Sequence, residues 1–443
     1  SLFAWRLARA LGARSGLALV ASGFALVAPV YLFRFPMHLA LSGQWTLLLA
    51  LWLYARPLPP RRWMWPLVAC LVAMIHAYLL AMVLAIWVAD LARRRWAGSL
   101  GWSGVAAEIA VVLVPTALVL WAVGFFMTGS LGIGGYGVYR LNLLGFVIPF
   151  DWSRLVPPIP AGRGDYEGMA FLGIGVLALL LVAIASGALP RLRRLGSHRW
   201  LPLLVVVVLM FGYALSDHIA IGGRELFTVP LPSVFRHFAA DFRSSGRFVW
   251  PAVYLLTVGA VVALGWRLRP ALAVGIAVVA LAAQFVDAAP SELRFHKTLP
   301  APSAVWSTPL ASPFWDRAAA AGFTRLRAIP YEAIFGDWRA LSYFAVTHGM
   351  ATDAAYLGRT DGRAEHALAA REAGELATGT LEAGTLYEVG HAATLATAAR
   401  LRPGDLLAWI DGRFIFARDG AALLDGLNIW ARYGAQPPAA AAH

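Results

Sequence analysis

Charged side chains that could bind or transform a substrate gather in a few polar segments between long apolar runs. One of these segments covers residues 216–248 and holds more charge than either run beside it. Residues 233–243 predict a short amphipathic helix, because Phe235, Phe238 and Phe242 fall on one helical face and basic residues fall on the other. Such a helix is typical of a membrane surface, where its aromatic side meets lipid and its basic side meets water.

Arginine is the residue that best matches a phosphate group, because its planar guanidinium makes bidentate hydrogen bonds. Arg243 ends the predicted helix, and Arg247 lies at the start of the next apolar run. We interpret the segment as a floor for the phosphate of a lipid-linked substrate, with anchoring to lipid head groups as the alternative. Further polar and aromatic residues are candidate binding residues: Arg236, His237, Asp241, Arg140 and Tyr166.

Carboxylates are scarce in this part of the chain, so those near the arginines are candidates for acid–base chemistry. Asp217 and His218, at the end of an apolar run, form the most base-like pair, and Glu167 lies just before another run. Transfer of a sugar to a hydroxyl needs one carboxylate as a general base, or a divalent metal ion held by carboxylates. We therefore predict catalytic roles for Asp217, His218 and Glu167, with a helix-end cap as the alternative for Asp217 and His218. The sequence does not define metal ligands.

Several reaction classes have no support in the sequence. The chain has no HExxH, GxSxG, Walker A or CxxC pattern. Its single cysteine, Cys70, lies in an apolar run, which excludes disulfides and thiolate metal sites. The glycines at positions 132, 134, 135 and 137 neither follow a clear strand nor lead into a soluble helix. They indicate a flexible or re-entrant turn rather than a phosphate-binding loop.

The elements that must position these residues are membrane-spanning helices. Of the 443 residues, 60% are hydrophobic and only 14% are charged, with a mean hydropathy of +0.66, which is typical of a multi-span membrane protein. Residues 1–290 hold 23 Lys and Arg against 9 Asp and Glu, whereas residues 291–443 hold 14 against 15. The basic excess therefore belongs to membrane loops, where it orients helices, and we expect no nucleic-acid partner.

The apolar runs predict a polytopic α-helical membrane domain of about nine spans over residues 1–290. The runs fall at about 16–33, 45–55, 63–91, 104–126, 169–188, 200–215, 249–265 and 271–288, and basic clusters separate them. If all the clusters are cytoplasmic, the 63–91 run must cross twice, as two short helices with a turn near residues 75–78. One long tilted helix is the alternative. The pair places the C-terminus outside, and the basic flank at Ser1 suggests spans upstream.

Four polar segments then share the outer face: residues 34–43, the turn at His76, residues 127–168 and residues 216–248. His38 and His76 become candidate binding residues because of this shared face; singly, each would be interpreted as a satisfied polar residue. Residues 127–168 are long for a connector, and long loops are usually functional or disordered. The aromatic content of this loop, which includes Tyr139 and Trp152, favours order.

From residue 291 onward the composition becomes that of a small α/β domain, which we expect to be extracytoplasmic. Residues 325–330, 385–389, 406–410 and 414–416 predict strands, and residues 338–348 and 392–399 predict helices. Asp411 and Gly412, between two of these strands, are a strong hairpin signal. Trp338, Tyr356 and Trp409 are candidates for stacking on sugars, with a core role as the alternative. Residues 437–443 predict a frayed tail.

Several segments carry a family resemblance. They are residues 34–53 (RFPMHLALSGQWTLLLALWL), 75–94, 164–177 (GDYEGMAFLGIGVL) and 242–256 (FRSSGRFVWPAVYLL), and the later GMATDAAYLGR and LAWIDGR. With the order of spans and outer domain, they resemble the GT-C class of membrane glycosyltransferases, in an uncharacterised bacterial subfamily. The resemblance implies a sugar taken from a polyprenyl-phosphate donor at the outer face of the inner membrane. It also implies a catalytic acid in the first outer loop. Residues 34–43 contain no acid, so either the acid lies upstream of Ser1 or the chemistry is lost.

Two functions are compatible with these residues. The first is an inverting glycosyltransferase, base-assisted or metal-assisted, acting on an envelope acceptor. In it, Arg243 and Arg247 hold the donor phosphate, Asp217 or an upstream acid deprotonates the acceptor, and Tyr166 and Glu167 contact a sugar. The second is a non-catalytic membrane protein that binds or moves a lipid-linked saccharide. Both require a lipid-linked sugar and membrane lipid as partners, but only the second tolerates Asp217→Asn and Glu167→Gln.

Overall fold

The computed structural model describes residues 1–35, 38–56, 63–126, 136–187, 199–298, 307–331, 338–355, 362–427, 429 and 431–432. The chain divides into two compact units. The first comprises Ser1–Met127 with Gly132–Pro300, and the second consists mainly of Ala301–His443. This boundary lies about ten residues after the expected one, because the last helix of the first unit, α13 (Pro270–Thr298), continues past Pro290.

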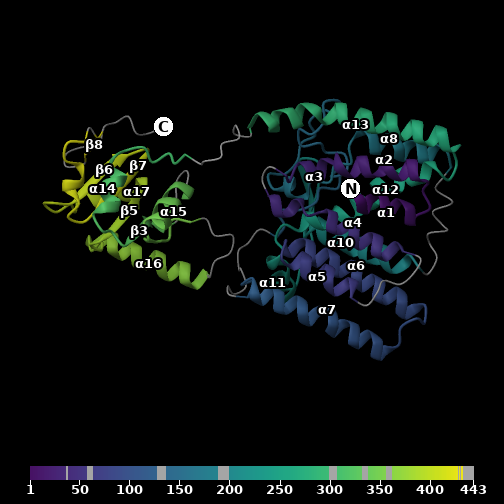
Figure 1. Ribbon diagram of the computed structural model, residues 1–443, viewed down its shortest axis with the longest axis horizontal. Helices are drawn as coiled ribbons and strands as arrows, with labels where there is room; N and C mark the ends of the chain where they lie inside the picture. The colour runs from purple at the N-terminus through teal and green to yellow at the C-terminus, as the bar shows by residue number, and fades with distance from the viewer. Residues whose placement is uncertain are drawn as a thin grey trace. The chain divides into compact units, whose positions relative to one another are not determined.

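The first unit is built almost entirely from helices (Figure 1). Among the described residues, four helical stretches are long and apolar enough to cross a membrane: Ser15–Leu32, Trp102–Ala122, Ser245–Leu264 and Pro270–Arg294. Four shorter apolar helical stretches accompany them: Leu39–Ala55, Met64–Ala73, Ile174–Ala185 and Leu201–Leu215. The main helices are α1 (Leu2–Ala10), α2 (Ser15–Leu26), α3 (Pro29–Leu32), α4 (Trp45–Ala55), α5 (Met64–Ala73), α6 (Ala77–Trp96), α7 (Trp102–Ala122), α8 (Ile174–Ala185), α10 (Leu201–Leu215), α11 (Ser233–Asp241) and α12 (Trp250–Leu264).

The 63–91 run forms two helices, as predicted. The first of them, α5, ends at Ala73, and α6 begins at Ala77, so the turn falls one to two residues before the expected position. His76 caps α6, since its Nδ1 accepts a hydrogen bond from the backbone N–H of Tyr78 at 3.2 Å. The second helix is not short, however, because it has 20 residues and continues through the arginine cluster at 93–95.

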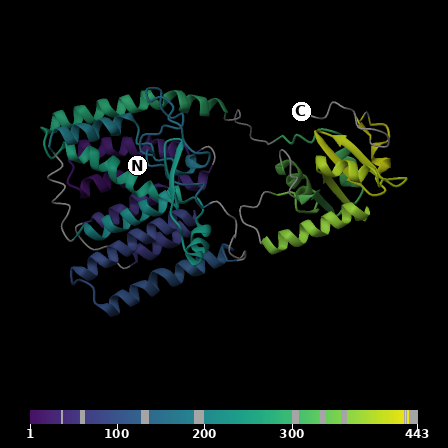
Figure 2. The same ribbon diagram turned by 180° about the vertical axis from the view of Figure 1, so that it is seen from behind.

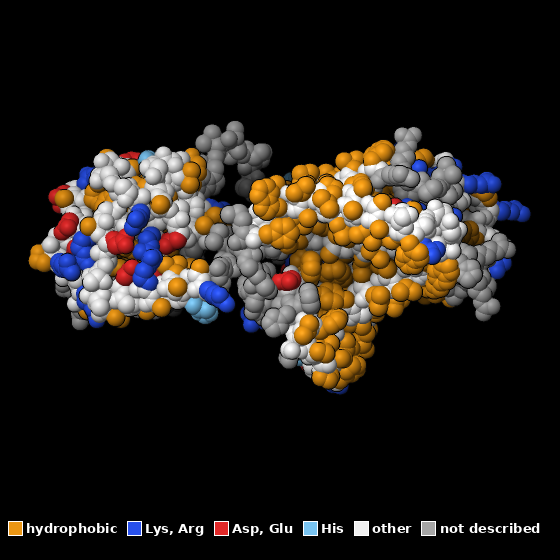
Figure 3. All heavy atoms as spheres, turned by 90° about the horizontal axis from the view of Figure 1, so that it is seen from below, with side chains coloured by type: hydrophobic (Ala, Val, Ile, Leu, Met, Phe, Trp, Pro, Cys, Tyr) orange, Lys and Arg blue, Asp and Glu red, His pale blue; other side chains and the backbone are white. Residues whose placement is uncertain are grey.

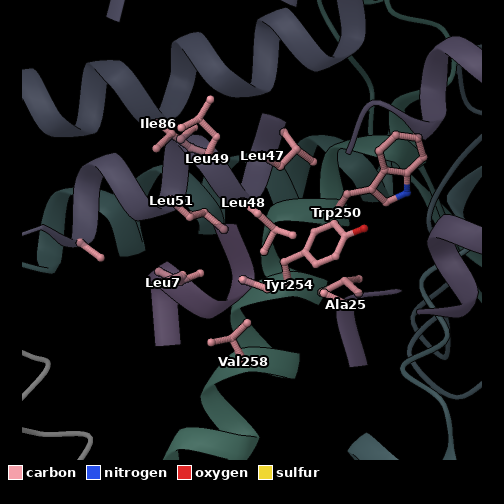
Figure 4. Packing of buried hydrophobic residues seen from close by; sticks show 14 of the residues in the cluster. Leu7, Ala25, Leu47, Leu48, Leu49, Leu51, Ile86, Trp250, Tyr254 and Val258 are labelled. Atoms are coloured by element: carbon pink, nitrogen blue, oxygen red, sulfur yellow. The ribbon is translucent and has the colours of Figure 1, made fainter. Parts of the chain in front are cut away.

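Helix α12 forms the centre of the helical unit. Of its membrane-span window, 72% is buried, against 17% for α7 and 28% for α13. Figure 4 shows Trp250, Tyr254 and Val258 of α12 packed beside Leu47 and Leu48 of α4. Helices α7 and α13 lie at opposite edges of the unit in both ribbon views (Figures 1 and 2). Both helices expose large hydrophobic side chains, and Figure 3, which views the unit from the α7 edge, shows a wide hydrophobic surface, as expected of helices in contact with lipid.

Residues 216–232 contain a β-hairpin that the sequence analysis did not predict. Strand β1 (His218–Ile221) pairs antiparallel with β2 (Arg224–Thr228), and the turn uses Gly222 at φ +56°. The side chain of Asn142 holds this turn through both the N–H and the C=O of Gly222, at 2.9 and 2.8 Å. The predicted amphipathic helix follows as α11.

The second unit contains a six-stranded mixed sheet in the order β4-β3-β5-β7-β6-β8. The strands are β3 (Arg325–Ile329), β4 (Ala351–Thr352), β5 (Thr385–Val389), β6 (Leu406–Ile410), β7 (Arg413–Ala417) and β8 (Ala431–Arg432). Strands β4, β3 and β5 run parallel, and the other pairs are antiparallel. Helices α14 (Phe314–Ala320), α15 (Trp338–Thr347), α16 (Gly362–Thr378) and α17 (His391–Ala398) complete the unit. The unit therefore combines helices with a sheet, as expected of a small α/β domain.

The predicted strands and the two predicted helices of this unit are confirmed, whereas α16 was not predicted. Asp411 (φ +46°) and Gly412 (φ +80°) form the turn between β6 and β7, as their types indicated. Trp409 is half-buried and packs against Phe414 at 4.4 Å between ring centroids, next to the core. Trp338 is also half-buried, and Tyr356 and the tail lie outside the described residues.

Candidate functional site

Segments distant in the sequence meet at one end of the helical unit. Arg34 follows α3, the short helix η2 (Asp165–Gly168) precedes α8, and η3 (Ser245–Val249) leads directly into α12. The loop around residues 139–142 lies between them, since the N–H of Gly246 bonds to the carbonyl of Tyr139 at 3.0 Å. Three of the four predicted outer-face segments therefore supply this site, and the fourth reaches it through Tyr78.

Glu167 lies at the centre of this meeting point and is paired with two arginines. Its Oε2 forms an ion pair with Nη2 of Arg34 at 2.9 Å. The same oxygen accepts two hydrogen bonds from Arg247, from Nε at 2.9 Å and Nη2 at 2.8 Å. All three residues are buried, and Arg34 also donates to the backbone carbonyl of Glu167 at 2.7 Å. We call these three residues the arginine–glutamate cluster; its formal charge is +1.

Opposing effects set the protonation of the cluster. Burial works to raise the pKa of Glu167, but the charges of Arg34 and Arg247 outweigh it and leave the pKa below its ordinary value. Burial also lowers the pKa of Arg34 to about 10, against the attraction of Glu167. Glu167 is therefore ionised at neutral pH and is a weak base. This geometry favours a role for Glu167 in positioning the arginines over its predicted role in catalysis.

Arg34 is the functional candidate that the sequence analysis missed. Its guanidinium lies between the rings of Phe33 and Trp250, at 5.0 and 5.7 Å from the ring centroids. Its side chain is fully buried, yet Nε and Nη1 have no hydrogen-bond partner among the described residues, and neither has Nε1 of Trp250. Its position in a short polar segment after an apolar run was the signal that could have found it.

Aromatic rings surround the remaining arginines. The guanidinium of Arg247 stacks over Tyr78 at 4.6 Å, and that of Arg243 lies over Tyr139 at 5.7 Å. The Tyr78 hydroxyl accepts a hydrogen bond from the N–H of Ser244 at 2.9 Å, which connects the start of α6 to η3. These cation–π contacts hold Arg247 beside the start of α6 and Arg243 beside the loop at residue 139.

Two glycines allow the segments to approach this closely. A Cβ on Gly168 would lie 2.3 Å from the carbonyl oxygen of Arg140, and one on Gly246 would lie 2.5 Å from the Cα of Gly168. The backbone of Arg140 therefore passes directly beside both glycines, and any side chain there would push the loop away. This contact requires a glycine at position 246, in the sequence SSGR.

The side chain of Arg140 belongs to a second polar network. It donates to Glu225 at 3.0 Å, to Asp165 at 3.3 Å and to the backbone carbonyl of His218 at 2.8 Å. Asp165 is buried and also accepts from Asn142 at 2.8 Å. Arg140 thus anchors the β1–β2 hairpin to the loop before α8, so the geometry gives this predicted binding residue a structural role.

Asp217 and His218 are adjacent but do not form the tight pair that the sequence suggested. The His218 Nδ1 lies 2.8 Å from Oε1 of Glu225, whereas its Nε2 lies 3.9 Å from Oδ2 of Asp217. The Oδ1 of Asp217 is buried and has no hydrogen-bond partner among the described residues. Asp217 contributes to raising the pKa of Tyr136 to about 12, after the larger effect of burial. Asp217 is thus a carboxylate with one buried oxygen that has no partner among the described residues.

The other predicted residues are arranged around the cluster or fall outside the description. Burial is the main cause that lowers the pKa of His38, and the charges of all three cluster residues also act on it. His38 therefore lies close enough to the cluster to interact with it electrostatically. Tyr166 packs edge-on against Tyr139, and its pKa is raised by burial and then by Glu167. His76 caps α6, and Asp241 ends α11. The side chains of Arg236 and His237 are outside the described part of the structure. The described residues include no group of three or more His, Cys, Asp or Glu that could hold a metal ion.

The comparisons with known proteins follow the two-unit division. A family model described as "Domain of unknown function (DUF6311)" matches residues 1–289, which is the helical unit. A second, described as the "DUF6311 C-terminal domain", matches residues 314–418 in the sheet unit. No curated protein and no solved structure matches the chain. The first match alone covers more than half of the residues, so the chain belongs to the DUF6311 family.

Proposed function

We propose that this chain is a membrane glycosyltransferase that moves a sugar from a polyprenyl-phosphate donor to an envelope acceptor. The observation that carries the proposal is the arginine–glutamate cluster. It combines two buried guanidiniums with one carboxylate at the end of an apolar helix bundle. The proposal includes about nine spans in a bacterial inner membrane, with the sheet unit outside, and it retains the resemblance to the GT-C class.

The donor phosphate binds beside Arg247 and Arg243, with Arg34 beneath. Arg34 and Arg247 share one carboxylate, so the cluster keeps a net positive charge that an anionic oxygen neutralises. Arg34 has two further donors without partners among the described residues, Nε and Nη1. The neighbouring Trp250 adds a third, its Nε1. Helix α11 exposes Phe235 and Val234, which suit the lipid boundary where the donor chain enters.

Asp217 is the general base in this proposal. The acceptor oxygen attacks the anomeric carbon of the donor sugar, and the bond from that carbon to the phosphate oxygen breaks. The electron pair of that bond stays on the phosphate, next to the arginines, while the acceptor proton passes to Asp217. The uncommitted Oδ1 of Asp217 supports this role, and Glu167, held by two arginines, does not compete for it.

The test is turnover of polyprenyl-phosphate sugars by the purified full chain in lipid nanodiscs, screened over several donor sugars. We expect lipid phosphate release that falls by about 100-fold or more in Asp217→Asn, as expected on losing a general base. Asp151→Asn, which changes an exposed acid of the same outer segment that has no role in the proposal, is the control and should retain activity. Absence of donor consumption with every sugar would overturn the proposal.

The second candidate function is non-catalytic binding of a lipid-linked saccharide. It is favoured by one observation: the carboxylate nearest the arginines is committed to an ion pair and is therefore a weak base. It predicts saturable donor binding without turnover, weakened in Arg247→Met and unchanged in Asp217→Asn. Binding and turnover measured on the same preparations separate the two functions.

A further inference from the structure

A large apolar groove lies in the helical unit, away from the arginine–glutamate cluster. It has a volume of about 510 Å³ and is formed by α8, α10 and α12, with Leu11 at one margin. The side chains that line it include Leu180, Ile184, Leu204, Val207 and Leu256. Gly259 of α12 also lines the groove, and a Cβ built there would meet no atom within 4 Å. Its volume falls within the range of about 300–1,000 Å³ that is usual for ligand sites.

The groove occupies the halves of its helices that are distant from the cluster. Arg247 lies just before α12, and Gly259 lies 12 positions later, which corresponds to roughly 18 Å along a helix. The groove residues of α10 belong to its first half, whereas the end of α10 near the cluster is Ala214. The groove is therefore separate from the proposed donor phosphate site.

Tryptophans with neighbouring arginines mark the far rim of the groove. Trp200 and Trp266 both line it, and each has an arginine as its sequence neighbour. Arg199 lies over the Trp200 ring at 5.3 Å and donates to the backbone carbonyls of Ala55 and Arg56. Arg267 is exposed and donates to the carbonyl of Gly187 at 2.7 Å. Within the described residues, neither arginine is paired with a carboxylate, so both positive charges are uncompensated.

We propose that this groove binds an anionic phospholipid, with an acyl chain along Gly259 and the head group on Arg199 and Arg267. Apolar walls match a hydrocarbon chain and offer no partner to a sugar. Tryptophan and arginine at one rim are the residues that meet lipid head groups at a membrane interface. Uncompensated guanidiniums favour an anionic head group over a zwitterionic one. This site goes beyond the proposed transfer of a sugar and does not depend on it.

The test uses the full chain purified in nanodiscs formed directly from its own membranes, with retained lipids identified by native mass spectrometry. Gly259→Phe fills the groove. Gly275→Phe in α13 is the matched control, because a Cβ there also meets nothing within 4 Å but the residue does not line the groove. We expect one tightly retained anionic phospholipid per chain, reduced by about tenfold or more in Gly259→Phe and unchanged in Gly275→Phe.

A second pair of variants tests the head group. Arg267→Gln should weaken the preference for anionic over zwitterionic phospholipid, measured by exchange into vesicles of phosphatidylglycerol or phosphatidylcholine. Arg269→Gln, another exposed arginine two positions on, should not. Retention of the same lipid by Gly259→Phe, a retained polyprenyl phosphate, or an unchanged head-group preference in Arg267→Gln would each overturn the proposal. Thermal unfolding of each variant confirms that it is folded.

Discussion

Replacement of Glu167 by glutamine tests the charge reasoning most directly. The carboxylate holds two buried guanidiniums through one oxygen, with contacts of 2.9 Å to Arg34 and 2.8 Å to Arg247. Those two nitrogens are therefore at most 5.7 Å apart, the sum of the two contacts. In Glu167→Gln the two positive charges face each other without an anion. At an effective dielectric constant of about 20, their repulsion is about 3 kcal/mol.

The expected loss of unfolding free energy is about 3–5 kcal/mol, the usual result of removing one partner of a buried ion pair. It is measured on the full chain in mixed micelles titrated with SDS. Arg34→Met is the informative comparison, because it leaves Glu167 paired with Arg247 and fills the space between two aromatic rings. We expect its loss to be less than half that of Glu167→Gln. A loss below about 1 kcal/mol in Glu167→Gln, or a larger loss in Arg34→Met, would refute the reasoning.

Three further predictions concern packing, pH and the sheet unit. Gly246→Ala should destabilise the helical unit by about 1–3 kcal/mol, because the new Cβ would lie 2.5 Å from the backbone of Gly168. The control, Gly212→Ala, should not destabilise the unit, because a Cβ there meets nothing within 4 Å. Because the pKa of Glu167 is lowered in the folded chain, its ionised form stabilises the fold at pH values above its unfolded pKa of about 4.3. Thermal stability should therefore not change through this group between pH 8 and 5, and it should decline as the pH falls further. Glu167→Gln should lose this pH dependence. Asp411→Ala should cost about 1–3 kcal/mol of sheet-unit stability, measured by hydrogen exchange of strands β6 and β7, because Asp411 accepts hydrogen bonds from Nε1 of Trp315 and the N–H of Ser312, both at 2.8 Å. A change below about 0.5 kcal/mol would contradict this role.

Local patterns in the sequence were enough to predict many elements. The apolar run at 63–91 was correctly divided at the turn that His76 caps, because placing the basic clusters on one side of a membrane predicted two helices there. Phe235 and Phe242 marked α11 and its end through helical spacing. The β6–β7 hairpin followed from Asp411 and Gly412, which tolerate positive φ. In the last two cases the determining patterns lie between residues a few positions apart.

The β1–β2 hairpin was missed because its strands lack the alternation of a half-buried sheet. All five residues of β2 are exposed, so the sequence of this strand shows no alternation of apolar and polar residues that would predict it. Its turn is held from outside by Asn142, 80 positions away in the chain. Glu225 belongs to the same hairpin, and His218 pairs with Glu225 instead of Asp217. A pairing inferred from adjacency in sequence was therefore replaced by one that depends on strand register.

By itself, the sequence determined that the chain is an apolar, mostly helical unit followed by a small sheet unit, and that arginines and scarce acids gather in its polar segments. Only the tertiary structure decided which of them pair. Arg34 and Glu167 are 133 positions apart in the sequence, and they meet where Gly168, Gly246 and the backbone of Arg140 pack closely against one another. Hydrophobic periodicity depends on the spacing of neighbouring residues and can be read from the sequence. A buried ion pair depends on how distant segments of the chain pack together in three dimensions.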